Sequence, residues 1–345
     1  MTDREIIFIS NESSPRPGGA GVIGDCIAAA HGHRKVTPRF VNSSAFGRGL
    51  KVIRYFWIFE LGLRCVCALP SIWGSKRVIL NDFGAAVIFN LLKPLIGNVP
   101  SVYIFHGLLE ESSSKFIKIK KKVLISFLKQ SSVRTIYVSD SIRKIAISEG
   151  YPDGLVGHMG FYLPRIVSTS NSRIKHSPED PLVFFLGGRI NERKMPLGSL
   201  DFLNEVARLS NRYVEVRIAG SDSGHLKALL ACALKFEANM RVVHLGFMRN
   251  FEVMTVMQHC DFVFNPSTYK EAAPTIAYEA GLLRVGYVYL FGESHVELGA
   301  YNPSMCIGIE SFSVCEAARF VALLANQNRS VKCIARNLEP IGILG

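Results

Sequence analysis

The sequence lacks the ligand spacings of a metal site. None of its eight cysteines form a Cys-x-x-Cys motif, and Cys65 and Cys67 have no second pair at zinc spacing. No Asp-x-Asp occurs either, so there is no obvious carboxylate pair to hold a metal on a diphosphate. We therefore expect no bound metal, no cofactor, and cysteines that stay reduced in a cytoplasmic protein.

A long uninterrupted apolar run is also missing. The most apolar stretch, about 52–74, is interrupted by the charged residues Arg54, Glu60 and Arg64. The apolar segments between them are too short to cross a membrane. The N-terminus is polar, and no signal peptide is visible. We expect the aromatic side chains of 52–74 to cover a core or to lie at a membrane surface.

A third absence concerns the glycine loop from Gly18 to Gly24, which contains Gly-x-Gly-x-x-Gly. In a dinucleotide fold this motif follows its strand at once, and an acidic residue lies about 20 positions later. Here eight residues separate strand and loop, and no Asp or Glu lies between Asp25 and Glu60. The pattern favours a loop that opens a helix near a substrate phosphate. An NAD(P)- or FAD-dependent oxidoreductase using this loop is the alternative.

Acidic residues are scarce in the first half of the chain only. Residues 1–165 carry 22 Lys and Arg against 11 Asp and Glu, a net charge of +11, whereas residues 166–345 carry 18 against 17, a net charge of +1. A basic half predicts an anionic partner surface for that half alone. The aromatic-rich signatures of RNA-binding modules are missing, so we expect no nucleic acid partner.

The segment from 115 to 129 concentrates this positive charge and is strongly amphipathic if it is helical. One predicted face carries the lysines and another the large apolar residues: Lys115, Lys118, Lys122 and Lys129 against Phe116, Ile119, Val123 and Phe127. Such a helix is typical of attachment to anionic lipid, which makes the four lysines candidates for facing a membrane. A surface helix with a solvated lysine face is the alternative.

Strand and helix patterns alternate along the chain, which predicts parallel sheets covered by helices. The alternation stops at 164–181, a stretch poor in large apolar groups, and then restarts. We therefore predict two Rossmann-like, doubly wound α/β domains, 1–165 and 166–345. Ligands in such sheets bind at the carboxyl ends of the strands, so the facing ends would form one cleft.

Several chemically distinctive residues follow predicted strands. His106 follows the apolar run 102–105, a position that suggests a role at the ligand, although a structural histidine is the alternative. Gly187-Gly188-Arg189 ends another strand, and Lys194 follows on the same loop. A guanidinium and an ammonium suit a diphosphate, and they would neutralise charge on a departing nucleotide.

The stretch 266–280 places two carboxylates at a helix start. A buried strand, 262–264, is followed by a polar turn and a helix from about residue 272, with Pro274 in its first turn. Glu271 would lie at the mouth of this helix and Glu279 one or two turns inside. Free N–H groups at a helix start bind phosphate, and carboxylates accept hydrogen bonds from sugar hydroxyls. We expect a polyol-bearing phosphate ligand here, contacted also by Ala272, Ala273 and Thr275.

Together these motifs resemble the GT-B nucleotide-sugar glycosyltransferases, specifically the retaining, family-four (group one) type. The resemblance is carried, in order, by Pro17-Gly18-Gly19-Ala20, Val138-Ser139-Asp140-Ser141, Gly187-Gly188-Arg189 with Lys194, and Phe264-Asn265-Pro266-Ser267 followed by Glu271 and Glu279-Ala280. It covers most of the chain. In place of the glycine-rich residues that many members have after the first glutamate, this chain has Ala272-Ala273-Pro274, which removes one backbone donor.

The resemblance implies a role for each matched residue. Glu271 would contact hydroxyls of the donor sugar and Glu279 the ribose, while Arg189 and Lys194 would hold the diphosphate. His106 would lie near the transferred sugar. Gly18 and Gly19 would bring backbone close to the donor phosphate. The family works without a bound metal and retains the anomeric configuration, with the departing diphosphate helping to accept the acceptor's proton.

The implied activity is transfer of a hexosyl or related sugar from a nucleotide-sugar to a lipid-linked or polysaccharide acceptor, in cell-surface polysaccharide biosynthesis. The basic first domain would bind the acceptor at the inner face of the plasma membrane, and the second domain the nucleotide-sugar. A GT-B sugar-nucleotide epimerase and a catalytically inactive sugar-nucleotide-binding protein are further alternatives.

Overall fold

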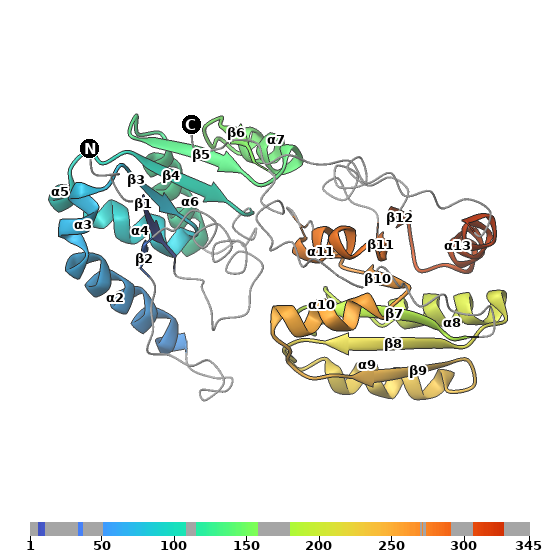
Figure 1. Cartoon of the computed structure of the whole chain (residues 1–345). Coiled ribbons are helices and arrows are strands. Elements are labelled where there is room, and N and C mark those ends of the chain that lie inside the picture. The colour runs from blue at the N-terminus through green and yellow to red at the C-terminus, as the bar shows by residue number, and fades with distance from the viewer. Residues whose placement is uncertain are drawn as a thin grey trace. The chain divides into compact units, whose positions relative to one another are not determined.

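The computed structural model describes residues 6–10, 34–36, 51–107, 115–157, 180–269, 271, 274–290 and 306–327. The chain divides into two compact units, and the division falls between residues 164 and 165 (Figure 1). Each unit is built around one parallel sheet with helices between most consecutive strands.

The sheet of the first unit has the order β2-β1-β3-β4-β5-β6, and all neighbouring strands are parallel. Its strands are β1 (Ile6–Ile9), β2 (Arg34–Val36), β3 (Arg77–Leu80), β4 (Ser101–Phe105), β5 (Val133–Tyr137) and β6 (Leu155–Val156). The order reverses between β1 and β3. In open parallel sheets, ligands bind at the carboxyl ends of the strands beside such a reversal.

Six described helices belong to the first unit: α2 (Lys51–Cys67), α3 (Leu69–Gly74), α4 (Phe83–Leu91), α5 (Lys93–Ile96), α6 (Lys115–Leu128) and α7 (Asp140–Ser148). The apolar stretch 52–74 is thus largely helical. Helix α4 packs against both α2 and α6. Its start is capped by the carboxylate of Asp82, which accepts a hydrogen bond from the N–H of Ala85 at 2.9 Å.

The sheet of the second unit has the order β12-β11-β10-β7-β8-β9 and is also parallel. Its strands are β7 (Leu182–Gly187), β8 (Val214–Ala219), β9 (Met240–His244), β10 (Phe262–Asn265), β11 (Gly286–Leu290) and β12 (Cys306–Ile309). The order reverses between β7 and β10, as in the dinucleotide-binding type of doubly wound sheet.

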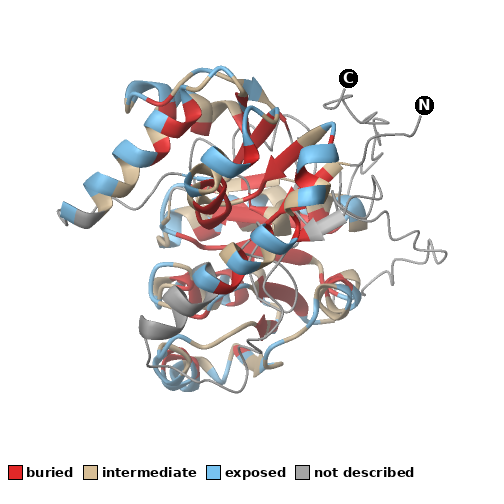
Figure 2. Cartoon of the chain, turned by 90° about the vertical axis from the view of Figure 1, so that its left-hand side faces the viewer, coloured by how far each residue is buried: buried red, intermediate tan, exposed pale blue. Residues whose placement is uncertain are grey.

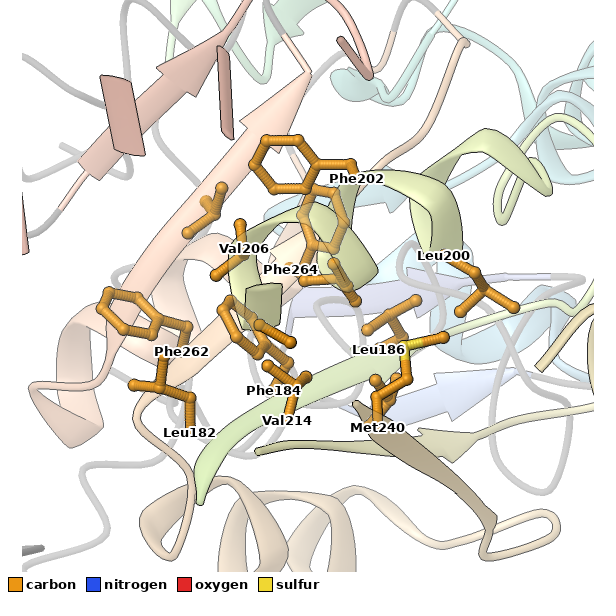
Figure 3. Close-up of a cluster of buried hydrophobic side chains, with 14 of the residues drawn as sticks. Leu182, Phe184, Leu186, Leu200, Phe202, Val206, Val214, Met240, Phe262 and Phe264 are labelled. Carbon is orange, nitrogen blue, oxygen red and sulfur yellow. The ribbon is translucent and has the colours of Figure 1, made fainter. Parts of the chain in front are cut away.

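Helices cover both faces of this second sheet. They are α8 (Gly198–Ser210), α9 (Leu226–Ala233), α10 (Asn250–Gln258), α11 (Thr275–Leu283) and α13 (Val314–Gln327), with a 3₁₀ turn at Leu234–Phe236. Successive side chains of a strand point to opposite faces. On β7, Phe184 therefore packs with α8 residues such as Phe202 (Figure 3), whereas Phe185 belongs to a separate cluster on the side of α10 and α11.

Burial follows the layers of the two units. Most strands are buried along most of their length, the edge strands β6 and β9 excepted, and the outward faces of the helices are exposed (Figure 2). Within the described residues, no helix is both long and apolar enough to cross a membrane.

Candidate functional site

Arg189, Lys194 and Glu271 come from loops that follow neighbouring strands of the second sheet. Arg189 and Lys194 lie in the loop after β7, and Glu271 lies in the loop after β10. Because β7 and β10 pair in parallel, both loops lie at the same edge, at the point where the strand order reverses. This is the edge at which such sheets bind ligands.

The loop after β7 is held in place by hydrogen bonds of its backbone. Gly188, with φ at +125°, donates its N–H to the carbonyl of Ala219, the last residue of β8, at 3.0 Å. Farther along, the side-chain oxygen of Asn191 accepts the N–H groups of Arg193 at 3.1 Å and of Lys194 at 2.9 Å. Lys194 is therefore presented from a fixed turn.

The structure brings Lys194 and Glu271 into direct contact. The ammonium Nζ of Lys194 forms an ion pair with Oε1 of Glu271, and the two side chains are only 31% and 10% exposed. The ring of Tyr269 lies beside the pair, 5.8 Å from Nζ of Lys194. Thr268 ties the two loops together by donating its N–H to the carbonyl of Arg193 at 2.8 Å. A cation and a carboxylate are thus held side by side at the sheet edge.

Helix α11 begins later than its sequence pattern predicts. It starts at Thr275, not near residue 272, and Pro274 is the residue that precedes it, with φ −66° and ψ 114°. A proline disfavours the helical conformation in the residue before it, so a helix is not extended backwards through Pro274. The prediction that Pro274 belongs to the first turn is therefore wrong. Ala272 and Ala273 lie outside the described residues.

Glu279 lies in the second turn of α11, one or two turns inside the helix as the sequence predicts, and it is buried. The residue is 4% exposed, and its carboxyl accepts a hydrogen bond from Nδ2 of Asn250, on α10, at 2.6 Å. Burial raises the pKa of Glu279 to about 7, against the smaller lowering effect of the Asn250 bond. The carboxyl is therefore poised to take up or release a proton near neutral pH.

This buried carboxyl predicts a pH-dependent stability. Because the folded pKa is raised from 4.5 to about 7, the folded state holds its proton longer than the unfolded chain does. Stability should therefore fall as the pH rises from 4.5 to 7, by about 3 kcal/mol. In Glu279→Gln this loss should be absent, so the variant should unfold at higher urea than wild type at pH 8. Glu237→Gln, at an exposed site, should show the same dependence of stability on pH as wild type. Equal pH profiles for Glu279→Gln and wild type would contradict the assignment of the raised pKa to Glu279.

Two residues of this region carry no role in the sequence-based prediction. Asn265 closes β10 and donates from Nδ2 to the hydroxyl of Tyr287, on β11, at 2.9 Å. Both side chains are buried, and burial together with the charge of Glu271 raises the pKa of Tyr287. The signal in the sequence is a polar residue directly after a buried strand; its partner, 22 positions away, is visible only in the fold.

In the first unit, His106 follows β4 as predicted and is joined to residues after two other strands. Its Nε2 lies 2.9 Å from Oδ1 of Asn81, after β3, and Asn81 in turn bonds Ser10, after β1, at 3.2 Å. Burial lowers the pKa of His106 to about 4, so its ring is neutral at pH 7. The glycine loop with Gly18 and Gly19 lies outside the described residues.

The lysine-rich segment forms helix α6, and its exposed face differs from the predicted one. All four candidate lysines, Lys115, Lys118, Lys122 and Lys129, are exposed as expected. Ile119 and Val123 were expected on a separate face with Phe127, but they are 57% and 39% exposed and lie among the lysines. The buried side of α6 is filled instead by Leu124, Phe127 and Leu128, because Phe127 packs edge-on against Phe89 of α4, with ring centroids 6.3 Å apart.

The described residues contain no group of three His, Cys, Asp or Glu side chains that could hold a metal ion. Each cysteine within these residues is a free thiol.

Comparison with known families and structures agrees with this geometry. Residues 167–287 match the family model of glycosyl transferases group 1, a range that includes Arg189, Lys194, Glu271 and Glu279. None of the curated protein sequences matches the chain.

Solved structures of several proteins, including the following three, share the fold over 94% of this chain. HepE of Anabaena, in complex with UDP-glucose, is 18% identical with a TM-score of 0.70 over 90% of its own chain. Sucrose-phosphate synthase of Thermosynechococcus elongatus is 13% identical (TM-score 0.68, 90% of its chain), and a glycosyltransferase of Rickettsia africae is 14% identical (TM-score 0.65, 89% of its chain). The predictions of a GT-B fold with two parallel α/β domains, and of the resemblance to group 1 glycosyltransferases, are confirmed.

Proposed function

We propose that this chain, whose fold is GT-B and whose second unit matches group 1 glycosyltransferases, transfers a sugar from a nucleotide-sugar with retention of anomeric configuration. The observation that carries the proposal is the contact between Lys194 and Glu271 at the strand-order reversal. A cation that can bind phosphate thus lies next to a carboxylate that can accept hydrogen bonds from sugar hydroxyls, and a sugar diphosphate requires both kinds of group.

The ion pair also suggests how the donor is received. In this structure Lys194 and Glu271 neutralise each other. A diphosphate carries more charge than one carboxylate, so it would draw the ammonium away and leave Glu271 to accept hydrogen bonds from the sugar. Arg189, exposed on the same loop, would be the second cation on the diphosphate. Glu279, in its ionised form, would accept hydrogen bonds from the ribose.

In this scheme the protein's contribution to bond breaking is electrostatic. As the bond between sugar and diphosphate breaks, negative charge grows on the departing phosphate, where Arg189 and Lys194 stabilise it. The acceptor hydroxyl attacks the same face of the sugar, and its proton passes to the leaving phosphate. No step requires a protein nucleophile.

For the donor we infer a UDP-sugar. HepE binds UDP-glucose, and a structurally similar E. coli protein is bound to UDP-2-fluoro glucose. A thermal-shift screen over UDP-, GDP-, ADP- and CMP-sugars tests the inference. UDP-sugars should raise the melting temperature most; stabilisation by another nucleotide class would overturn the choice of UDP, and no stabilisation by any of them would count against the proposed function.

For the acceptor we propose a lipid-linked or polysaccharide substrate at the cytoplasmic face of an anionic membrane. The support is the exposed face of α6, where Ile119 and Val123 lie among Lys118 and Lys122. Lysines attract anionic headgroups, while the apolar side chains insert beside them. Further large apolar residues of the first unit are exposed on α2 to α5: Phe59, Leu63, Val66, Trp73, Leu91 and Leu95.

The double variant Lys118→Gln/Lys122→Gln tests the membrane contact. Each lysine near an anionic surface contributes about 1 kcal/mol to membrane binding. The affinity of the double variant for phosphatidylserine-containing vesicles, measured by sedimentation, should therefore be about 30-fold lower than that of wild type. Wild-type binding should also decrease as salt rises. Lys235→Gln, exposed in the second unit, is the matched control and should bind like wild type. Binding that ignored salt, anionic lipid and the double substitution would exclude this surface.

A further inference from the structure

A chain of hydrogen bonds runs across the reversal point of the first sheet and ends at His106. It links the residues that follow three neighbouring strands: Ser10 after β1, Asn81 and Asp82 after β3, and His106 after β4. The hydroxyl of Ser10 donates to Oδ2 of Asp82 at 3.0 Å, Nδ2 of Asn81 donates to Oγ of Ser10 at 3.2 Å, and Oδ1 of Asn81 lies 2.9 Å from Nε2 of His106. Ser10 and Asn81 are 0% exposed.

The carboxylate at the far end sets the direction of every bond in this chain. An ionised carboxylate only accepts hydrogen bonds, so the Ser10 hydroxyl is the donor in its hydrogen bond with Asp82. The oxygen of Ser10 is then the acceptor for Asn81, and this requires the NH₂ group of Asn81 to face it. With the reverse amide orientation, two acceptor oxygens would face each other inside the protein, which is costly. The carbonyl of Asn81 therefore faces His106.

A carbonyl oxygen can only accept, so Nε2 of His106 must carry a proton. The neutral imidazole has one N–H, and once that N–H is on Nε2 the other nitrogen, Nδ1, is an acceptor. Burial supports the neutral state, because it lowers the pKa of His106 to about 4. The tautomer of the ring is thus determined by the residue that follows another strand, β3, 25 positions earlier in the sequence.

We propose that Asn81 is a positioning residue that holds His106 in its Nε2–H tautomer, so that Nδ1 is available to accept a hydrogen bond from a ligand hydroxyl. This inference rests on the proposed function for the nature of the ligand, a sugar. A sugar hydroxyl can donate to Nδ1, whereas a fully ionised phosphate cannot. The network therefore adapts His106 to a hydroxyl-bearing ligand.

Nitrogen-15 NMR on the full-length chain with labelled histidines tests the proposal without relying on turnover. The chain has nine histidines, so the His106 signals are identified by their absence in His106→Gln. In wild type at pH 7, we expect a protonated Nε2, an unprotonated Nδ1, and an Nε2–H proton that exchanges slowly with water. A protonated Nδ1 in wild type would overturn the proposal.

Variants of Asn81 separate positioning from simple packing. In Asn81→Leu, no side-chain acceptor faces Nε2, so the slowly exchanging Nε2–H signal should disappear. In Asn81→Asp, an oxygen remains and the signal should return. Ser10→Ala, a smaller change, should weaken the signal by freeing the Asn81 amide to rotate. Asn90→Leu, on α4, should leave it unchanged, and persistence of the signal in Asn81→Leu would overturn the proposal.

Activity gives a second, independent result. With a UDP-sugar donor, Asn81→Leu should lower kcat/KM about 10- to 100-fold, the range found when the orienting partner of a histidine is removed at metal sites, and Asn81→Asp should recover part of the loss. If the chain transfers no sugar but the NMR results hold, the proposed function fails and the tautomer assignment stands. If wild type transfers sugar but His106 is protonated on Nδ1, the inference about Asn81 fails alone.

Discussion

Replacing Glu271 with glutamine is expected to lower kcat/KM for sugar transfer by about 100- to 1,000-fold, the range for losing one well-placed electrostatic group. Glutamine has nearly the same shape, but it has one acceptor oxygen in place of two and no charge to pair with Lys194. The variant should remain folded, because Glu271 lies in a loop at the sheet edge and not in the core. The measurement is release of UDP from a UDP-sugar with and without acceptor.

A matched control lies on the neighbouring loop. Glu192 is exposed in the turn that presents Lys194, so Glu192→Gln changes the same charge without touching the pair. Its kcat/KM should stay within about twofold of wild type, as for a surface site without a specific role. If Glu192→Gln and Glu271→Gln lost equal activity, net charge of the loop, and not the Lys194–Glu271 contact, would account for the effect.

Replacing Gly220 with alanine is expected to lower the stability of the fold strongly, and by more than the same replacement at Gly224. Gly220 has φ at +151°, and a Cβ there would lie 1.6 Å from the carbonyl oxygen of Gly188. Backbone of either loop would have to move, so we expect a loss of about 3 kcal/mol or more in the free energy of unfolding. Because Gly188 precedes Arg189, binding of a UDP-sugar should weaken as well.

Gly224→Ala separates this clash from backbone strain. Gly224 has φ at +98°, but nothing lies within 4 Å of its hypothetical Cβ. Alanine there should cost only about 1–2 kcal/mol, the strain of the left-handed region. Urea unfolding of both variants makes the comparison. If Gly220→Ala were no less stable than Gly224→Ala, the result would contradict the close approach of the loops after β7 and β8.

The strands were the most predictable part of the fold. The segments 6–9 and 214–219 match β1 and β8 residue for residue. Residues 6–9 are an uninterrupted apolar run, which a strand buried on both faces requires, whereas in β8 the apolar residues alternate with Glu215 and Arg217. Helix α2 was harder to predict: its outer side carries Phe59 and Leu63, both more than half exposed, so the usual contrast between a polar and an apolar side is weak.

The site was predictable where it depends on position after a strand, and not where it depends on contacts across the sheet. The loop positions of Lys194 and Glu271 follow from parallel strands ending at one edge. Their ion pair depends on β7 and β10 being neighbours, which periodicity does not encode. The same holds for Asn250, which contacts Glu279 from another helix, and for Asn81, which contacts His106 from the end of another strand.

Calorimetric titration of the full-length chain with UDP-glucose, in wild type and in Lys194→Met, tests the central claim most directly. Methionine keeps much of the length and apolar character of the lysine stem but removes the ammonium. Wild type should bind, and the variant should bind at least about 10-fold more weakly, because a charge-assisted bond to phosphate contributes roughly 1.5–3 kcal/mol. Equal affinity in the two proteins, or no binding to wild type, would contradict the assignment of Lys194 and Glu271 to a nucleotide-sugar site.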